Sequence, residues 1–222
     1  MKRKVILATL LMALLLPMTL SAQDSLQVCN GTTTNNYIPF YGYYNDSRFR
    51  NEFVYPARLL GEMNGGTISH LTFYSQDNSQ SWNSNLVLRI AEVNDTSYDA
   101  SSAWKLPDGT DTAWTGTCSV VNGRWEIELD NPYLYNGGNL LISIMNTAAG
   151  TGCPHSHFYG QNLSYSASAY VNGATSITNP SANNTPQFLP KVTFTYSISG
   201  DICFTPNNLV VSQVTSDSAT LS

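Results

Sequence analysis

Charged residues are scarce in this sequence of 222 residues, where Asp, Glu, Lys and Arg together make up 11%, against about a quarter in ordinary soluble domains. The chain has 10 basic and 15 acidic residues. A nucleic-acid interface needs clustered Lys and Arg to neutralise phosphates, and an anionic membrane surface attracts proteins through the same residues. The composition therefore excludes nucleic acid as a partner and disfavours anionic membrane surfaces.

Sustained helical periodicity is also absent from the chain. Short segments of alternating apolar and polar residues recur instead, separated by turns rich in Gly, Asn, Asp and Pro. The clearest of them span residues 67–74, 86–93, 114–121, 124–129, 139–145 and 188–197. About nine or ten short strands at this spacing are typical of a sandwich or jelly roll. The predicted fold class is all-β, an antiparallel β-sandwich of jelly-roll type.

One hairpin can be predicted in detail. Asn122-Gly123 is the turn dipeptide with the strongest preference for a two-residue hairpin loop. In the strand that follows, Trp125, Ile127 and Leu129 alternate with charged residues. We expect these three side chains to point into the core and the charged ones to face solvent.

The longest apolar run, residues 5–16, follows Lys2, Arg3 and Lys4. It is shorter than the roughly 20 residues that a membrane span needs, and small residues follow it at Ser21 and Ala22. This pattern predicts a cleaved signal peptide over residues 1–22, with an uncleaved anchor as the alternative. Without the three leader bases, 7 basic and 15 acidic residues remain, a net charge of −8. We expect a secreted protein or one on the outer cell surface, with no membrane span after cleavage.

The mature chain keeps an even number of cysteines, Cys29, Cys118, Cys153 and Cys203. Exported proteins form disulfides readily, and four cysteines allow three pairings. We predict that these residues form disulfides, and the sequence leaves the pairing open. Their wide spacing matches neither a zinc ribbon nor a redox pair.

Four segments follow from these patterns. Residues 1–22 are the signal peptide and residues 23–36 a polar leader. Residues 37–198 form the β-sandwich domain, which begins with an aromatic stretch at 37–46 that the later strands must cover. Residues 199–222 are a linker and the start of a further module.

Two resemblances support this division. Residues 38–46, 55–57, 63–68 and 133–141 resemble an N-terminal module of exported Bacteroidetes proteins, over about residues 37–196. This resemblance implies a surface or secreted protein with a lectin-like or adhesin-like sandwich, and it brings no catalytic residues. Residues 206–211 and 214–222 are similar to the first two strands of a fibronectin type III domain, which implies a truncated module here and further modules downstream.

Aromatic residues predicted to lie on loops are the candidates for ligand binding. Flat rings with a polar edge suit sugar faces or a protein partner. The candidates are Trp82 and Trp104, followed by Tyr43 and Tyr44. The alternative is that these rings pack in the core or at its rim, because all-β domains use aromatic residues heavily.

Carboxylates support two weaker hypotheses. Glu126, Glu128 and Asp130 alternate along one predicted strand and resemble the acidic strand of laminarinase-type jelly-roll hydrolases, although the second and last acids do not match. The alternative is the solvent face of a hairpin. A structural Ca²⁺ is a second hypothesis, with oxygen ligands of the kind it prefers available at Asp46, Asp77, Asn78, Asp95 and Asp130. No other cofactor is predicted.

The sequence therefore predicts a non-catalytic binding or adhesion module that recognises a glycan or an extracellular protein through loop aromatics. A structural spacer within a larger surface protein is the first alternative. A jelly-roll glycoside hydrolase is the second.

Overall fold

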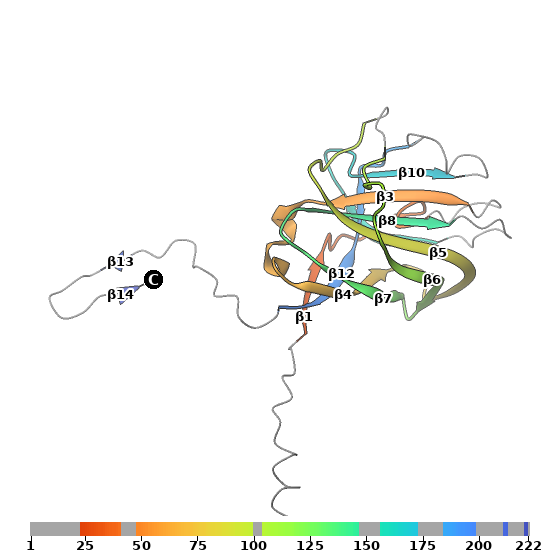
Figure 1. Cartoon of the computed structure of the whole chain (residues 1–222). Coiled ribbons are helices and arrows are strands. Elements are labelled where there is room, and N and C mark those ends of the chain that lie inside the picture. Colours follow the sequence, from red (N-terminus) through yellow and green to blue (C-terminus); the bar gives the residue numbers. More distant parts are fainter. Residues whose placement is uncertain are drawn as a thin grey trace, which may run out of the picture.

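The computed structural model describes residues 23–40, 48–99, 104–146, 156–172 and 184–198, and two short strands at 211–212 and 220–221. It is an all-β structure built of antiparallel sheets, as predicted (Figure 1). The larger sheet has nine strands in the order β1-β12-β4-β7-β6-β5-β8-β3-β10. In chain order these are β1 (Asp24–Val28), β3 (Phe49–Tyr55), β4 (Thr67–Tyr74), β5 (Ser79–Val93), β6 (Thr112–Val121), β7 (Arg124–Leu134), β8 (Asn139–Asn146), β10 (Ser168–Asn172) and β12 (Val192–Ser197).

A second sheet has three strands in the order β11-β9-β2. They are β2 (Thr33–Asn35), β9 (Phe158–Asn162) and β11 (Phe188–Pro190). Two short 3₁₀ helices, η1 (Ala57–Leu59) and η2 (Gly61–Met63), join β3 to β4. In the part of the chain that the structure describes, no helix is long and apolar enough to cross a membrane.

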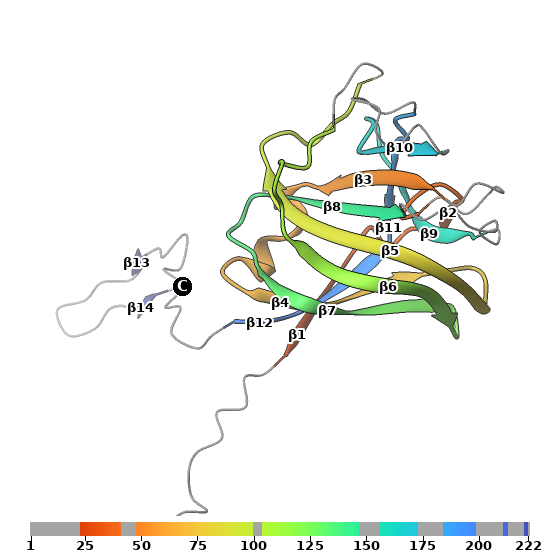
Figure 2. The same ribbon diagram turned by 45° about the vertical axis from the view of Figure 1, so that its right-hand side comes forward.

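The nine-stranded sheet curls over on itself, so that its two halves face each other. β3, β8 and β5 lie above β12, β4 and β7 in Figures 1 and 2. Rings from the two halves meet edge to face: Phe53 lies 6.1 Å from Phe73, and Tyr55 lies 5.5 Å from Phe194. The two halves of one sheet therefore form the two layers of the sandwich.

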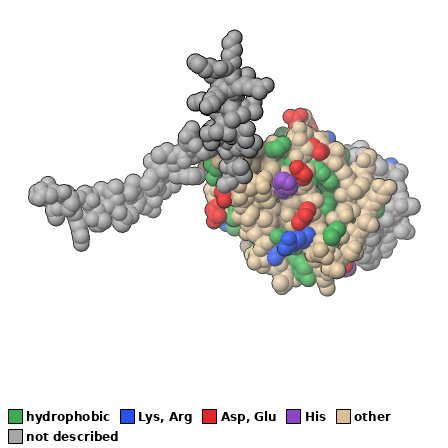
Figure 3. Space-filling model, turned by 90° about the horizontal axis from the view of Figure 1, so that it is seen from below, with side chains coloured by type: hydrophobic (Ala, Val, Ile, Leu, Met, Phe, Trp, Pro, Cys, Tyr) green, Lys and Arg blue, Asp and Glu red, His purple; other side chains and the backbone are tan. Residues whose placement is uncertain are grey.

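The predicted hairpin is confirmed. Asn122 and Gly123 have φ values of 52° and 71°, and φ is positive at both central residues of the hairpin turn that Asn-Gly favours. Along β7, the side chains of Trp125, Ile127 and Leu129 are buried and those between them are exposed. Figure 3 looks at the molecule from below and shows few charged side chains, spread among polar ones.

The sandwich begins earlier in the chain than the sequence predicted. Residues 23–36 were expected to form a polar leader, but β1 pairs with β12 and β2 pairs with β9. The expectation fails because β1 lies at an edge of its sheet. Polar residues are tolerated there on a strand that is largely exposed.

The described part of the aromatic stretch packs in the core, against strands of both sheets, without forming a strand. Ile38 and Phe40 are completely buried, and the Phe40 ring lies 5.3 Å from that of Trp125. The buried side chain of Asn51 donates hydrogen bonds to the carbonyls of Tyr37 (2.6 Å) and Pro39 (3.2 Å). Side-chain hydrogen bonds thus supply the partners that a strand would find in a neighbouring strand.

Near the C-terminus, β13 (Val211–Ser212) and β14 (Thr220–Leu221) pair antiparallel. They fall within the two segments that are similar to the first strands of a fibronectin type III domain. That assignment stays a prediction.

The close approach of β9 to its neighbours gives a test of this packing. A methyl group at Gly160 would collide with the Leu189 carbonyl and the Phe188 ring, whereas one at Gly61 would meet nothing within 4 Å. We expect Gly160→Ala to lower the free energy of unfolding by about 1–3 kcal/mol, the usual range for overpacking, as measured by urea denaturation. Gly61→Ala is the control and should change it by less than about 1 kcal/mol. Equal effects would contradict the packing described here.

Candidate functional site

The connection between β5 and β6 lies against the outer face of the upper half of the sandwich. Tyr98, in this connection, is buried against a small apolar cluster separate from the main core, formed with Val54 on β3, Leu141 on β8 and Ala169 on β10. Trp104 and Leu106 pack at the edge of the same cluster. The connection therefore packs on the sheet through an apolar cluster that is separate from the main core.

A buried carboxylate fastens the connection to β3. The side chain of Glu52 is fully buried on the outer face and forms an ion pair of 2.9 Å with Arg50. Its other oxygen accepts hydrogen bonds from the Tyr98 hydroxyl (3.0 Å) and the Lys105 backbone N–H (2.8 Å). One carboxylate thus holds two points of the connection and is neutralised by one arginine.

Tyr98 keeps its proton in this environment. Burial, followed by the neighbouring charge of Glu52, raises the pKa of Tyr98 well above its ordinary value. The hydroxyl therefore remains a hydrogen-bond donor to Glu52 at neutral and moderately alkaline pH.

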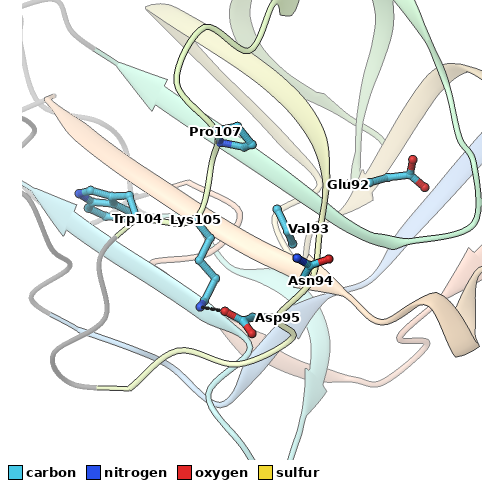
Figure 4. Close-up of a pocket in the computed structure, with 7 residues that line it drawn as sticks. All are labelled: Glu92, Val93, Asn94, Asp95, Trp104, Lys105 and Pro107. Carbon is cyan, nitrogen blue, oxygen red and sulfur yellow. Dashed lines mark hydrogen bonds and ion pairs between the residues drawn. The ribbon is translucent and has the colours of Figure 1, made fainter.

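A hollow of about 460 Å³ opens beside this anchored connection (Figure 4). Its lining consists of Glu92, Val93, Asn94, Asp95, Trp104, Lys105 and Pro107. Trp104 and Glu92 stand at opposite ends of this group, and Lys105 and Asp95 point toward each other between them. The Lys105 ammonium lies 2.9 Å from an Asp95 carboxylate oxygen. The lining combines one large ring with several polar groups.

Both ends of the hollow are held in place. The Arg50 guanidinium lies 4.3 Å from the centroid of the Trp104 ring, a distance at which a cation is attracted to an aromatic face. At the other end, Glu92 accepts hydrogen bonds from the backbone N–H groups of Asn136 (3.0 Å) and Gly138 (2.7 Å). Contacts within the protein therefore hold the lining of the hollow at both ends.

Trp104 is the sequence-predicted site residue that lies at this hollow, and it is half-buried. Tyr43 and Tyr44 lie outside the described residues. No sequence pattern pointed to the groups that position the hollow, which are Glu52, Arg50 and Tyr98. One signal was present: Glu52 is the single acidic residue in the otherwise largely apolar segment 52–57.

The placement of Trp82 on an exposed loop is wrong. Residues 79–85 belong to β5, and Trp82 pairs with Cys118 on β6. The Trp82 side chain is 7% exposed and packs against Phe40 and Phe49, with ring centroids 5.9 and 6.3 Å away. A ring buried in the core cannot stack on a ligand, so Trp82 is a core residue.

The acidic strand lies where the solvent-face hypothesis put it. Glu126, Glu128 and Asp130 are exposed on β7, and the side chain of Glu128 is 82% exposed at 3.9 Å from the His70 ring. They lie side by side along one strand, whereas glycoside hydrolysis uses two carboxylates on either side of the scissile bond. The hydrolase hypothesis stays a prediction with no support from this geometry.

The oxygen ligands proposed for calcium are spread over the molecule and have other partners. Asp77 accepts a hydrogen bond of 2.8 Å from the His157 backbone N–H, Asp95 pairs with Lys105, and Asp130 accepts one of 3.0 Å from the Thr115 backbone N–H. Asp46 lies outside the described residues. Among the residues that are described, no group of three His, Cys, Asp or Glu could hold a metal ion.

The described cysteines are both buried. Cys29 follows β1 as a free thiol, and Cys118 lies on β6. The prediction that Cys29 forms a disulfide is therefore wrong for this structure. Cys153 and Cys203 are outside the described residues, so disulfides among Cys118, Cys153 and Cys203 stay a prediction. Burial raises the pKa of the Cys29 thiol from 9.0 to about 11, against the opposing effect of the Arg58 charge.

No protein-family model, curated protein or solved structure matches this chain.

The Glu52 anchor can be tested by removing its charge. We expect Glu52→Gln to lower the free energy of unfolding by about 2–4 kcal/mol, because it leaves Arg50 without its counter-ion in a largely buried position. Hydrogen exchange at the Lys105 amide should become faster in the variant. Glu128→Gln removes an exposed carboxylate and should stay within about 0.5 kcal/mol of the wild type. A Glu52→Gln variant as stable as Glu128→Gln would contradict the anchoring role.

Cys29 gives a second test, by thiol titration with Ellman's reagent. At pH 8 the native thiol should be unreactive, since it is buried and protonated. After unfolding without reductant it should react, and Cys29→Ala should lose that signal. The pKa of the Cys29 thiol is 9.0 in the unfolded chain and about 11 in the native protein. As the pH rises between these values, the unfolded chain loses this proton before the native protein does. The Cys29 contribution to the free energy of unfolding should therefore decline over that interval. One reactive thiol more in Cys29→Ala than in the wild type would place Cys29 in a disulfide, because the substitution would free the thiol of its partner.

Proposed function

We propose that this chain is a non-catalytic binding module of a secreted or cell-surface protein, and that it recognises a glycan in the hollow beside Trp104. The observation that carries the proposal is the combination of one fixed indole ring with the polar groups of Asn94, Asp95, Glu92 and Lys105 around a single hollow. Sugars offer both an apolar face and several hydroxyls, and rings with nearby polar groups complement both.

The size of the hollow favours a small ligand over a protein surface. About 460 Å³ falls within the range of roughly 300–1,000 Å³ that is usual for small-ligand sites. A stable protein partner would need a contact of about 800 Å² on each side. We therefore favour the glycan over an extracellular protein.

Export is supported by the leader sequence, and by the resemblance of residues 37–196 to modules of exported Bacteroidetes proteins. The similarity of the tail to the start of a fibronectin type III domain supports further modules after this one. On this proposal the sandwich presents its binding hollow while other modules set its distance from the cell.

A structural spacer is the second candidate, and one observation favours it. Tyr98, Trp104 and Leu106 pack over Val54, Leu141 and Ala169, and covering that face is by itself a sufficient role for the connection.

The two candidates differ in what happens when Trp104 is removed. Wild-type protein, Trp104→Ala and Tyr74→Ala should be titrated with neutral and acidic oligosaccharides in a calorimeter. We expect Trp104→Ala to weaken binding about tenfold, because losing about 1.4 kcal/mol of ring contact corresponds to that factor.

Tyr74→Ala is the matched control. Tyr74 is another half-buried ring near cations, with Lys191 4.6 Å and Arg124 5.9 Å from its centroid, but it lies on β4, in the other half of the sandwich. Its loss should leave affinity unchanged. Unchanged binding by Trp104→Ala would overturn the proposed site, and a wild-type protein that binds no oligosaccharide would favour the spacer.

A further inference from the structure

A second hollow is lined by the same connection, from Leu106 to Thr110. It has a volume of about 290 Å³ and is lined by Arg50, Arg89, Met145 and residues 106–110. Two guanidinium groups thus share one small hollow in a chain with 10 basic residues and a net charge of −5. Such a concentration of positive charge is unusual for this protein.

The sheet register places Arg89 in a row of polar groups. Arg89 on β5 is opposite Ser143 on β8, and Ser143 is opposite Glu52 on β3. Residues directly opposite in antiparallel strands project from the same face of the sheet. Arg89, Ser143 and Glu52 therefore lie side by side on the outer face, next to the connection.

Hydrogen-bond donors in and beside this hollow have no acceptor in the described structure. The Arg50 Nε–H and the Ser143 hydroxyl are buried without a hydrogen-bond partner, and Ser143 is 1% exposed. Arg89 forms no ion pair with any described residue. The oxygens of Glu52 are already taken by Arg50, Tyr98 and Lys105. A buried hydrogen-bond donor without an acceptor destabilises the protein. An anionic acceptor would satisfy such a donor best, because hydrogen bonds to a charged group are the strongest.

We propose that this second hollow binds the anionic group of an acidic glycan, a carboxylate or a sulfate, with Arg89 as the principal charged contact. The inference rests on the proposed function and narrows it, because it specifies the ligand as an acidic sugar chain. Pro107 lines both this hollow and the one beside Trp104, so the two hollows adjoin and a single chain of sugars can occupy both. Asp108, the acidic residue of the described lining, is exposed on its turn, where water and salt screen its charge.

The test compares ligands that differ only in their anionic group. Tetragalacturonate and its methyl ester form one pair, and a chondroitin sulfate tetrasaccharide and its desulfated form make the other. Affinities are measured by calorimetry for the wild-type protein, Arg89→Gln, Arg89→Lys, Trp104→Ala and Arg124→Gln. Arg124→Gln is the control because it removes a cation from the start of β7, outside this hollow. A melting curve of each variant checks that it folds.

We expect the wild-type protein to bind at least one acid form about tenfold more tightly than its matched partner. A difference within the galacturonate pair reports recognition of a carboxylate, and a difference within the chondroitin pair reports recognition of a sulfate. The two anionic groups are thereby distinguished. Arg89→Gln should abolish the preference for the acid form, and Arg124→Gln should retain all of it. Arg89→Lys should keep part of it, because lysine has the positive charge but lacks the planar guanidinium that makes two parallel hydrogen bonds.

Equal wild-type affinity within both pairs would overturn the anion site, as would a preference that persists in Arg89→Gln. Binding of the uncharged methyl ester that still depends on Trp104 would in that case leave the proposed function intact. Absence of binding to all four oligosaccharides would overturn the anion site and count against the proposed function as well.

Discussion

Aromatic packing between the two halves of one continuous sheet is the constraint on which this structure depends. A single antiparallel sheet has two faces, and here curling brings one of them against itself, so that Phe53 meets Phe73 and Tyr55 meets Phe194. The Tyr55 hydroxyl also donates a hydrogen bond of 2.9 Å to the Pro190 carbonyl. Burial of large rings supplies most of the favourable free energy in such a core.

The opposite face of the upper half is organised by a different interaction. There a buried carboxylate, Glu52, gathers an arginine, a tyrosine hydroxyl and a backbone amide. Burying a charged group destabilises a protein unless the group is paired. Here the partners of Glu52 include two groups of the connection between β5 and β6, so pairing this charge also holds the connection against the sheet. The core therefore determines the fold, and the charge on β3 determines where the connection lies.

Alternation and turn chemistry made much of the fold predictable. Asn122-Gly123 and the inward residues of β7 are local signals, and both were found as predicted. Trp82 was misplaced because its neighbours, Ser79 to Asn85, are polar residues that usually form loops. In the structure they extend β5 to 15 residues, with Trp82 as the inward member.

The candidate site was predictable only in part. Trp104 was found because aromatic residues on long connections are visible in sequence. Glu52 was not, because its partners Tyr98 and Lys105 lie 46 and 53 residues away. Which distant groups meet on one carboxylate depends on the register of β3, β5 and β8, and no local pattern encodes that register.

The separation between the main core and the smaller outer cluster affects how this protein can diversify. In the described part of the chain, the rings that hold the sandwich closed belong to the main core, whereas Tyr98, Trp104 and Leu106 of the connection pack in the outer cluster. Substitutions at the tip of the connection, from Pro107 to Thr110, can therefore change the shape and charge of the hollows with little effect on folding. A lineage that keeps Glu52 and its three partners retains the position of the connection and is free to vary the residues that line the hollows.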